Sequence, residues 1–319
     1  MLTFDNLDEI CGVEACAVAM GNFDGMHVGH VRLIGMAVDG ARRRGLRSAV
    51  FTFSGHPRNM LAGGGVAVKN IQYPQEKAEM IRSLGVDYLF SIPFTQEIRR
   101  MPPDAYIDGL LLKSFGMAAA YCGFNYRFGY LAAGDADALR AAGRARGFEV
   151  FVLGPQKVGG ALASSSLIRA MIAEGRMEEC AALLGREYSV RGVVAMGNRI
   201  GRTIGFPTLN IHVDSDMVTP SHGVYITNCY FDGMKWPGVT NVGVRPTIGD
   251  EKKSIETHLL DFDGDLYGKP VRVEFASMLR EERRFAGVEQ LAEQIGRDSM
   301  AAREYHREKN KIFANAPDL

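Results

Sequence analysis

In the first half of the chain, short hydrophobic runs alternate with longer segments of helical spacing. Runs that are apolar on both faces predict strands at 15–20, 48–53, 87–92, 118–124 and 149–153. Segments with helical spacing follow at 28–44, 75–84, 104–115 and 135–146. Buried strands separated by helices form parallel sheets, so this half predicts a doubly wound, Rossmann-like α/β domain. Its strands should carry a ligand site at their carboxyl ends.

The pattern changes near residue 185, where strand-like stretches and turn residues replace the helices. Strands are predicted at 189–195, 223–231, 238–242, 254–261 and 271–275, which suggests an antiparallel barrel or sandwich. Val288, Leu291 and Ile295 then supply an apolar face for one closing helix. We therefore expect two domains, 1–184 and 185–319.

Composition narrows the class of protein. The 319 residues are 46% hydrophobic, and 37 Lys and Arg balance 37 Asp and Glu, so neither a disordered chain nor a dedicated nucleic-acid binder is expected. The five cysteines are scattered, the first residues are acidic, and no apolar run approaches the ~20 residues of a membrane helix. We expect a cytoplasmic protein without a nucleic-acid or membrane partner.

A glycine-rich turn, GNFDGMHVGH at 21–30, follows the first predicted strand. The start of a helix offers unpaired backbone N–H groups and a positive dipole end, both of which suit phosphate. His27 and His30 add donors for the charge that develops on a transferred phosphoryl group, which favours nucleotidyl transfer. Taken alone, the turn is more typical of one surface and one core histidine.

Two further segments of this half carry candidate chemistry. SSSLIR at 164–169 reads as a helix N-cap cluster with an arginine one turn later, although serines cap helices routinely. GFNYRFGY at 123–130 follows the fourth strand, where aromatic rings could flank a planar ligand and Asn125 offers an amide. Aromatic residues after a strand are, taken alone, more often part of a core.

In the second half, GVVAMGNRIGRTIGFPTLN at 192–210 is rich in glycine but lacks the P-loop pattern. A glycine-rich flap of this kind can still surround a triphosphate. The Thr208 hydroxyl and the Asn210 carbonyl are hard oxygen donors that suit Mg²⁺. The alternative is a turn-rich hairpin in which both are turn residues.

Taken together, these motifs resemble the bacterial bifunctional riboflavin kinase/FAD synthetases over nearly the whole chain. The likeness extends to FTFSGHP at 51–57, NVGVRPT at 241–247, SIETHLLDF at 254–262, DLYG at 265–268 and LREERRF at 279–285. It implies a nucleotidyltransferase domain followed by a β-barrel kinase domain. The implied reactions are phosphorylation of riboflavin to FMN, then adenylylation of FMN to FAD with release of pyrophosphate. ATP is the implied co-substrate and Mg²⁺ the implied cofactor.

The resemblance also implies roles for residues of the first half. His27, His30 and Arg169 would grip the ATP phosphates, and Asn125, Tyr126 and Phe128 would bind flavin. The wider set of implied nucleotide contacts is Gly21, Phe23, Asp24, Gly25, Gly29, Asn125, Ser164 and Ser165.

In the kinase half, the resemblance implies that Glu256 is the catalytic base and that Thr208 and Asn210 bind Mg²⁺. Arg280 would lie near flavin. The implied nucleotide contacts are Gly197, Gly201, Gly205, Pro207 and Thr208.

Two departures from the family pattern leave alternatives open. Ser166 replaces the usual threonine, and the segment 63–74 matches poorly. The rival interpretations are a riboflavin kinase with an inactive N-terminal half, a flavin- or nucleotide-binding regulator without turnover, and nucleotidyl transfer to another phosphorylated substrate.

Overall fold

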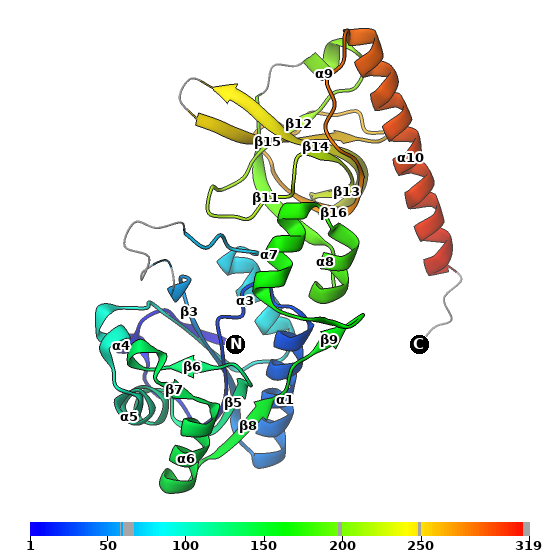
Figure 1. Cartoon of the computed structure of the whole chain (residues 1–319). Helices are drawn as coiled ribbons and strands as arrows, with labels where there is room; N and C mark the ends of the chain where they lie inside the picture. Colours follow the sequence, from blue (N-terminus) through cyan, green and yellow to red (C-terminus); the bar gives the residue numbers. More distant parts are fainter. Residues whose placement is uncertain (58, 60–66, 197–199, 248–249, 315–319) are drawn as a thin grey trace. The chain divides into compact units, whose positions relative to one another are not determined.

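The computed structural model describes residues 1–57, 59, 67–196, 200–247 and 250–314. The chain forms two compact units, Met1–Leu167 and Ile168–Leu319, which separate within helix α7 (Ser165–Glu174). Figure 1 traces the chain through both units. The domain boundary expected after residue 184 stays a prediction, and the compact units separate earlier in the chain.

The first unit contains a six-stranded sheet in the order β1-β4-β3-β2-β5-β8, in which every pairing is parallel. Its strands are β1 (Leu2–Phe4), β2 (Cys16–Met20), β3 (Arg47–Phe53), β4 (Tyr88–Ile92), β5 (Met117–Gly123) and β8 (Glu149–Leu153). The five predicted strands are confirmed. The edge strand β1 was not predicted, because three residues are too short to show a period.

Helices cover both faces of this sheet, so the doubly wound prediction is confirmed (Figure 1). One core lies under α1 and α3, and the other packs α4, η2 and α6 on the opposite face. The helices are α1 (Val28–Arg44), α3 (Pro74–Ser83), α4 (Gln96–Arg100), α5 (Pro103–Ala105), η2 (Tyr106–Ser114) and α6 (Ala136–Arg146). Two short 3-10 helices are η1 (Leu7–Glu9) and η3 (Tyr130–Ala132). Two short antiparallel ribbons pair β6 (Arg127–Phe128) with β7 (Gly134–Asp135) and β9 (Lys157–Val158) with β10 (Ala161–Leu162). The helix expected at 104–115 forms largely as the π-helix η2.

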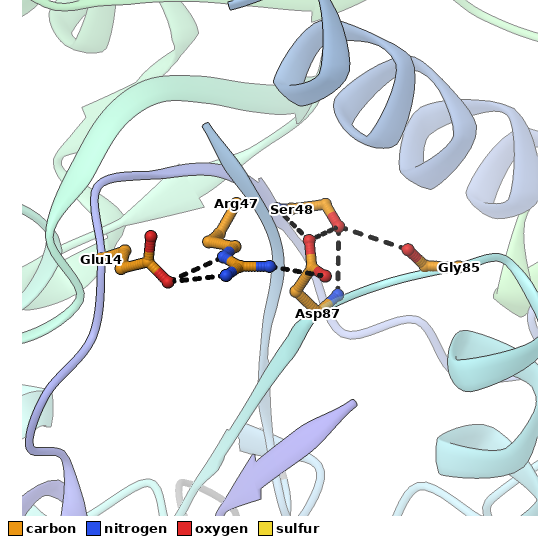
Figure 2. Close-up of polar contacts among 5 residues, drawn as sticks. All are labelled: Glu14, Arg47, Ser48, Gly85 and Asp87. Carbon is orange, nitrogen blue, oxygen red and sulfur yellow. Dashed lines mark hydrogen bonds and ion pairs between the residues drawn. The ribbon is translucent and has the colours of Figure 1, made fainter. Parts of the chain in front are cut away.

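A polar network joins the amino ends of β3 and β4 (Figure 2). The Asp87 carboxylate accepts hydrogen bonds from the Ser48 backbone N–H and hydroxyl, each at 2.8 Å. Arg47 lies between Asp87 and Glu14, with an N–O distance of 2.8 Å to Glu14. The network lies at the opposite ends of the strands from the turn at 21–30, so it stabilises the sheet away from the predicted site.

The second unit is a closed antiparallel barrel in the order β11-β12-β15-β14-β13-β16, which settles the choice between barrel and sandwich. Its strands are β11 (Tyr188–Ala195), β12 (Leu209–His212), β13 (Gly223–Phe231), β14 (Met234–Thr247), β15 (Asp250–Leu259) and β16 (Pro270–Arg280). Inside the barrel, Thr227, Thr240 and Thr257 are fully buried, and their hydroxyls form a chain with two O–O distances of 2.8 Å.

Four helices accompany the barrel: α7, α8 (Met177–Leu184), α9 (Ile200–Thr203) and α10 (Val288–Ala314). The closing helix is confirmed as α10. Of its predicted apolar face, Leu291 and Ile295 are half-buried and Val288 is 52% exposed, and the covered face continues through Asp298, Ser299 and Ala302, which are buried. An ion pair between Asp298 and Arg280 joins the helix to the end of β16, which a search for apolar residues could not reveal.

Candidate active sites

The predicted phosphate-binding turn places two imidazole rings at the start of α1. His27 is the N-cap residue, and its Nδ1 accepts a hydrogen bond from the His30 backbone N–H at 3.3 Å. The two rings stack with their centroids 3.6 Å apart and their planes 17° from parallel. The structure therefore brings the two predicted histidines together where the helix dipole favours an anion.

His30 is electrostatically unusual. Burial, with smaller contributions from His27 and Lys77, holds the pKa of His30 well below its ordinary value. Its buried Nδ1 has no hydrogen-bond partner among the described residues. A neutral imidazole has one N–H donor and one acceptor nitrogen, so His30 can still donate to a phosphate oxygen.

The backbone of this turn is tightly constrained. Phe23 (φ 49°), Gly25 (φ 83°) and Met26 (φ 40°) all adopt left-handed conformations. A Cβ at Gly25 would lie 3.0 Å from Ile71, and one at Gly29 would lie 3.2 Å from the His27 ring. A Cβ at Gly21 would likewise crowd the Phe23 ring. The glycines are thus required for packing within the turn as well as for approach of a ligand.

Phe23 was expected to contact nucleotide, but it is fully buried. Its ring packs edge-on against His30 at a centroid distance of 5.2 Å. With no exposed surface the ring supports the histidine from beneath, and a nucleotide contact by Phe23 stays a prediction. The periodicity of the sequence could not show this, because Phe23 owes its burial to the left-handed turn.

Asp24 and Ser165 connect the turn to other segments. The Asp24 carboxylate accepts the Ile71 backbone N–H at 3.0 Å, and its backbone carbonyl accepts the Ser165 hydroxyl at 2.8 Å. Ser164 accepts the Leu167 N–H at 3.3 Å, as expected of a helix cap. The two serines and the glycine-rich turn therefore meet within the first unit. Arg169 lies one turn into α7, in the second unit.

The predicted flavin segment presents a mixed surface. Asn125 is exposed and Tyr126 is half-buried, with its hydroxyl 3.1 Å from that of Tyr106. Phe128 is only 4% exposed and stacks beneath Tyr126 at a centroid distance of 5.7 Å. Asn125 and Tyr126 can reach a ligand in this arrangement, whereas Phe128 forms part of the core that supports them.

In the barrel, three polar residues form a row across neighbouring strands. Glu256 on β15 lies directly opposite Asn210 on β12 and Asn241 on β14. Directly paired residues share one face of a sheet, so the three side chains are neighbours. Ile255 and Thr257 point into the barrel, which places Glu256 on the other face.

Asn210 also lines a cavity of about 230 Å³. Pro207 and Thr208 contribute to the same cavity, together with a loop that includes Asp263 and Asp265. Asn210 is buried, and its Oδ1 has no hydrogen-bond partner among the described residues. A buried, unpartnered carbonyl oxygen beside a threonine hydroxyl fits a hard cation such as Mg²⁺. The described residues contain no cluster of three or more His, Cys, Asp or Glu that could hold a metal ion.

The flap that precedes Asn210 is closely packed. A Cβ at Gly201 would lie 2.3 Å from the Phe206 carbonyl oxygen, and Gly205 adopts a left-handed φ of 84°. His258 Nδ1 lies 2.9 Å from the Pro207 carbonyl oxygen, which anchors the residue before Thr208. Gly197, another expected nucleotide contact, lies outside the described residues.

Arg280, expected near flavin, is paired with α10. Its guanidinium donates to the Asp298 carboxylate, with a shortest distance of 2.8 Å, and to the Glu281 carbonyl at 3.1 Å. The two side chains of the ion pair are only 13% and 7% exposed. Contact between Arg280 and flavin stays a prediction.

Sequence reasoning missed several residues beside the first site. Lys77, Asn70 and Gln72 line a small cavity with Asn22, Asp24 and His56. Asn70 and Gln72 belong to the segment that matched the family poorly, and Lys77 lies in the predicted helix 75–84 outside any motif. The parallel pairing of β2 with β3 brings the carboxyl ends of these two strands together beside α3. A prediction of this pairing would have indicated that Lys77 on α3 lies near the site.

Comparison with known proteins supports both units separately. Residues 12–167 match the FAD synthetase family model, and residues 184–306 match the riboflavin kinase family model. The bifunctional riboflavin kinase/FMN adenylyltransferase of Listeria monocytogenes is 35% identical over 90% of this chain and 91% of its own. The Escherichia coli K12 enzyme of the same description is 34% identical over 92% and 93% of the two chains.

A solved structure shares the whole fold. The crystal structure of a macrolide-efflux protein from Streptococcus pneumoniae superimposes with a TM-score of 0.86 at 28% identity, covering 95% of this chain and 98% of the other. Within the described residues of our chain, no helix combines the length and apolar character needed to span a membrane. The family models and the relatives agree over nearly the full length, and the chain belongs to the bifunctional riboflavin kinase/FMN adenylyltransferase family.

Proposed function

We propose that the barrel transfers the γ-phosphate of ATP to the ribityl 5′-hydroxyl of riboflavin with Glu256 as the base. The Glu256 carboxylate accepts the hydroxyl proton as that oxygen bonds to the γ-phosphorus and the bond to ADP breaks. One observation carries this assignment: Asn210, whose buried Oδ1 has no hydrogen-bond partner in the described part of the chain, lies directly across the strand pair from Glu256.

Thr208 and Asn210 would hold Mg²⁺ in the same cavity. The cation, when bound, neutralises charge on the ATP phosphates. Pro207, Gly201 and Gly205 would shape the flap around the triphosphate. Asp263 and Asp265 line the cavity too, and they can bind water molecules of the hydrated cation.

In the first unit, we propose that a phosphate oxygen of FMN attacks the α-phosphorus of a second ATP, and that pyrophosphate leaves. His27 and His30 would bind the triphosphate, with the N–H groups at the start of α1, and Arg169 stays a predicted phosphate contact. A flavin phosphate is already ionised at neutral pH, so this step needs no base. Positioning and electrostatic stabilisation then account for most of the rate. Asn125 and Tyr126 would contact the flavin.

The native protein can test both assignments at once. Purified enzyme is incubated with ATP and Mg²⁺, starting from riboflavin in one reaction and from FMN in another, and the flavins are separated chromatographically. We expect FAD from both, and no product when Mg²⁺ is chelated. FMN without FAD would leave the kinase alone, and flavin binding without any product would make the protein a regulator.

We place both reactions in the cytoplasm. All five cysteines are free thiols, and four of them are buried, as suits a reducing compartment.

A further inference from the structure

Lys77 lies beside the first site, but the mechanism above gives it no role. It belongs to α3, and its ammonium donates to the Asn22 carbonyl at 3.4 Å, the Phe53 carbonyl at 3.4 Å and the Thr52 hydroxyl at 3.3 Å. The Thr52 hydroxyl in turn donates to the Asn22 carbonyl at 3.0 Å. One cation therefore connects residues that belong to two different strand ends.

These contacts lie where they can influence the phosphate-binding turn. Phe53 ends β3, and Asn22 is the second residue after β2 and begins the turn that leads to His27. The two strands are neighbours in the sheet, paired in parallel up to Met20 and Phe51. Beyond that point the Gly21 backbone N–H still donates to the Phe51 carbonyl at 3.2 Å, and Lys77 with Thr52 adds polar contacts between the two segments.

The space around Lys77 argues against direct contact with a substrate. The cavity that it lines with Asn22, Asp24, His56 and Gln72 has a volume of about 30 Å³. That is room for about one water molecule, not for a nucleotide or a flavin.

We propose that Lys77 is a positioning residue for adenylyl transfer, whose ammonium joins the carboxyl ends of β2 and β3 and so holds the turn that carries His27 and His30. This inference rests on the phosphate-binding roles proposed for those histidines. Misplacing a binding group by about 1 Å can cost a hundredfold in rate. Loss of the Lys77 contacts to Asn22, Thr52 and Phe53, which we call the clamp, can therefore lower the rate of adenylyl transfer strongly.

The charges around Lys77 make the clamp sensitive to pH. Burial lowers the pKa of Lys77 to about 8, although the Asp24 carboxylate opposes the shift. His30 on α1 and His56 after β3 are the other titratable groups nearby, and His27 stacks on His30. An ammonium has three donors for its three acceptors, whereas the neutral amine has two, so the clamp weakens as the pH rises through about 8.

The test compares Lys77→Met, which keeps the length of the side chain, with Lys113→Met at an exposed lysine of η2 as the matched control. FAD formation from FMN and ATP is measured from about pH 6.5 to 9.5, a range that spans the lowered lysine pKa. Riboflavin phosphorylation by the barrel of the same molecule serves as the internal reference. Lys77→Met should lower kcat/KM for FAD formation about tenfold or more, with phosphorylation unchanged.

The pH profile separates a clamp from a merely structural contact. The native enzyme should lose FAD-forming activity above about pH 8, which gives its pH profile a basic limb. Lys77→Met should show no basic limb. Lys77→Arg should move the limb to a pH beyond the measured range. Thr52→Val, which keeps the lysine and removes one of its acceptors, should give a smaller loss with the limb retained. It also preserves the test if Lys77→Met does not fold.

Native kcat/KM in Lys77→Met, an equal loss in Lys113→Met, or an unchanged basic limb in Lys77→Met would each overturn the inference. His27→Ala distinguishes its failure from that of the proposed site. If His27→Ala loses FAD formation and Lys77→Met does not, only the role of Lys77 is wrong. If His27→Ala retains FAD formation, the proposed phosphate site fails, and the inference fails with it.

Discussion

At the turn between β2 and α1, the groups proposed to bind a triphosphate are backbone N–H groups and two stacked imidazoles, whereas in the barrel they are oxygen atoms on neighbouring strands. In the first site, left-handed backbone conformations and the N-cap of α1 position the two histidines. The second is held by strand register, with Asn210 opposite Glu256.

The difference corresponds to the two nucleophiles. A hydroxyl must lose its proton as it attacks, and the barrel offers a carboxylate. A phosphate is already ionised, and the turn offers hydrogen-bond donors, one of them an imidazole whose pKa burial holds well below its ordinary value. Each unit thus supplies the type of group that its own reaction requires, and variants of the two units should fail independently.

The largest expected effect comes from Glu256→Gln, which keeps the shape of the side chain and removes the base. Riboflavin phosphorylation should fall about 10²- to 10⁴-fold, while supplied FMN is still converted to FAD. The two reactions are assayed separately by flavin chromatography, with Glu289→Gln at an exposed position of α10 as the control. Near-native phosphorylation in Glu256→Gln would remove this residue from the base role.

His27→Ala tests the other half of the comparison. FAD formation should drop about 10²- to 10³-fold, because a preorganised donor to the phosphates is lost. FMN formation from riboflavin should not change. His212→Ala, at an exposed position on β12, serves as the control for loss of an imidazole. A parallel decline of both activities in folded His27→Ala protein would contradict the separation of the two sites.

Asn210→Leu should have a more moderate effect that is confined to the kinase. Removing one oxygen ligand should raise the Mg²⁺ concentration for half-maximal phosphorylation about 10- to 100-fold. Titration of Mg²⁺ at saturating ATP measures this directly. An unchanged Mg²⁺ dependence with reduced kcat would mean that Asn210 supports Glu256 and not the cation.

The smallest effect concerns stability, in the network of Figure 2. Burial alone would raise the pKa of Asp87, but hydrogen bonds from Ser48 and the charge of Arg47 outweigh it, so the pKa is lowered. A lowered pKa stabilises the fold above the ordinary value for aspartate and loses that effect as the pH falls through the folded value. Asp87→Asn should cost about 1 kcal/mol or less near neutral pH, because the carboxylate is partly exposed.

Denaturant unfolding of the native protein and of Asp87→Asn at a series of pH values tests this prediction. The difference in unfolding free energy should begin to shrink below about pH 4, where the aspartate of the unfolded chain takes up a proton, and should vanish below the lower pKa of the folded protein. A difference that stays constant down to pH ~3 would assign the stabilisation to packing.

Much of the architecture could be predicted because buried strands and helices carry apolar residues at characteristic spacings. Strands β2 and β3 are covered on both faces and read as continuous apolar runs. The π-helical form of η2 could not be predicted, because the same apolar spacing fits an α-helix. Barrel and sandwich could not be separated either, since closure depends on the pairing of β12 with β15.

The candidate site was predictable as far as local motifs reach. The stacking of His27 on His30 follows from their spacing around a helix start, whereas the burial of Phe23 and the position of Lys77 depend on segments distant in sequence. The role of Asp298 was hidden for the same reason, because its partner Arg280 lies on a different element.

The chain of threonine hydroxyls inside the barrel restricts the register in which β15 can pair with β14. If β15 slipped by one residue against β14, Thr257 would leave the interior, Glu256 would enter it, and the hydroxyl of Thr240 would lose its partner on β15. Such an error would bury a carboxylate and leave a polar group unpaired, so it is penalised twice. The threonine hydroxyls therefore favour the register that keeps Glu256 on the outer face of the barrel.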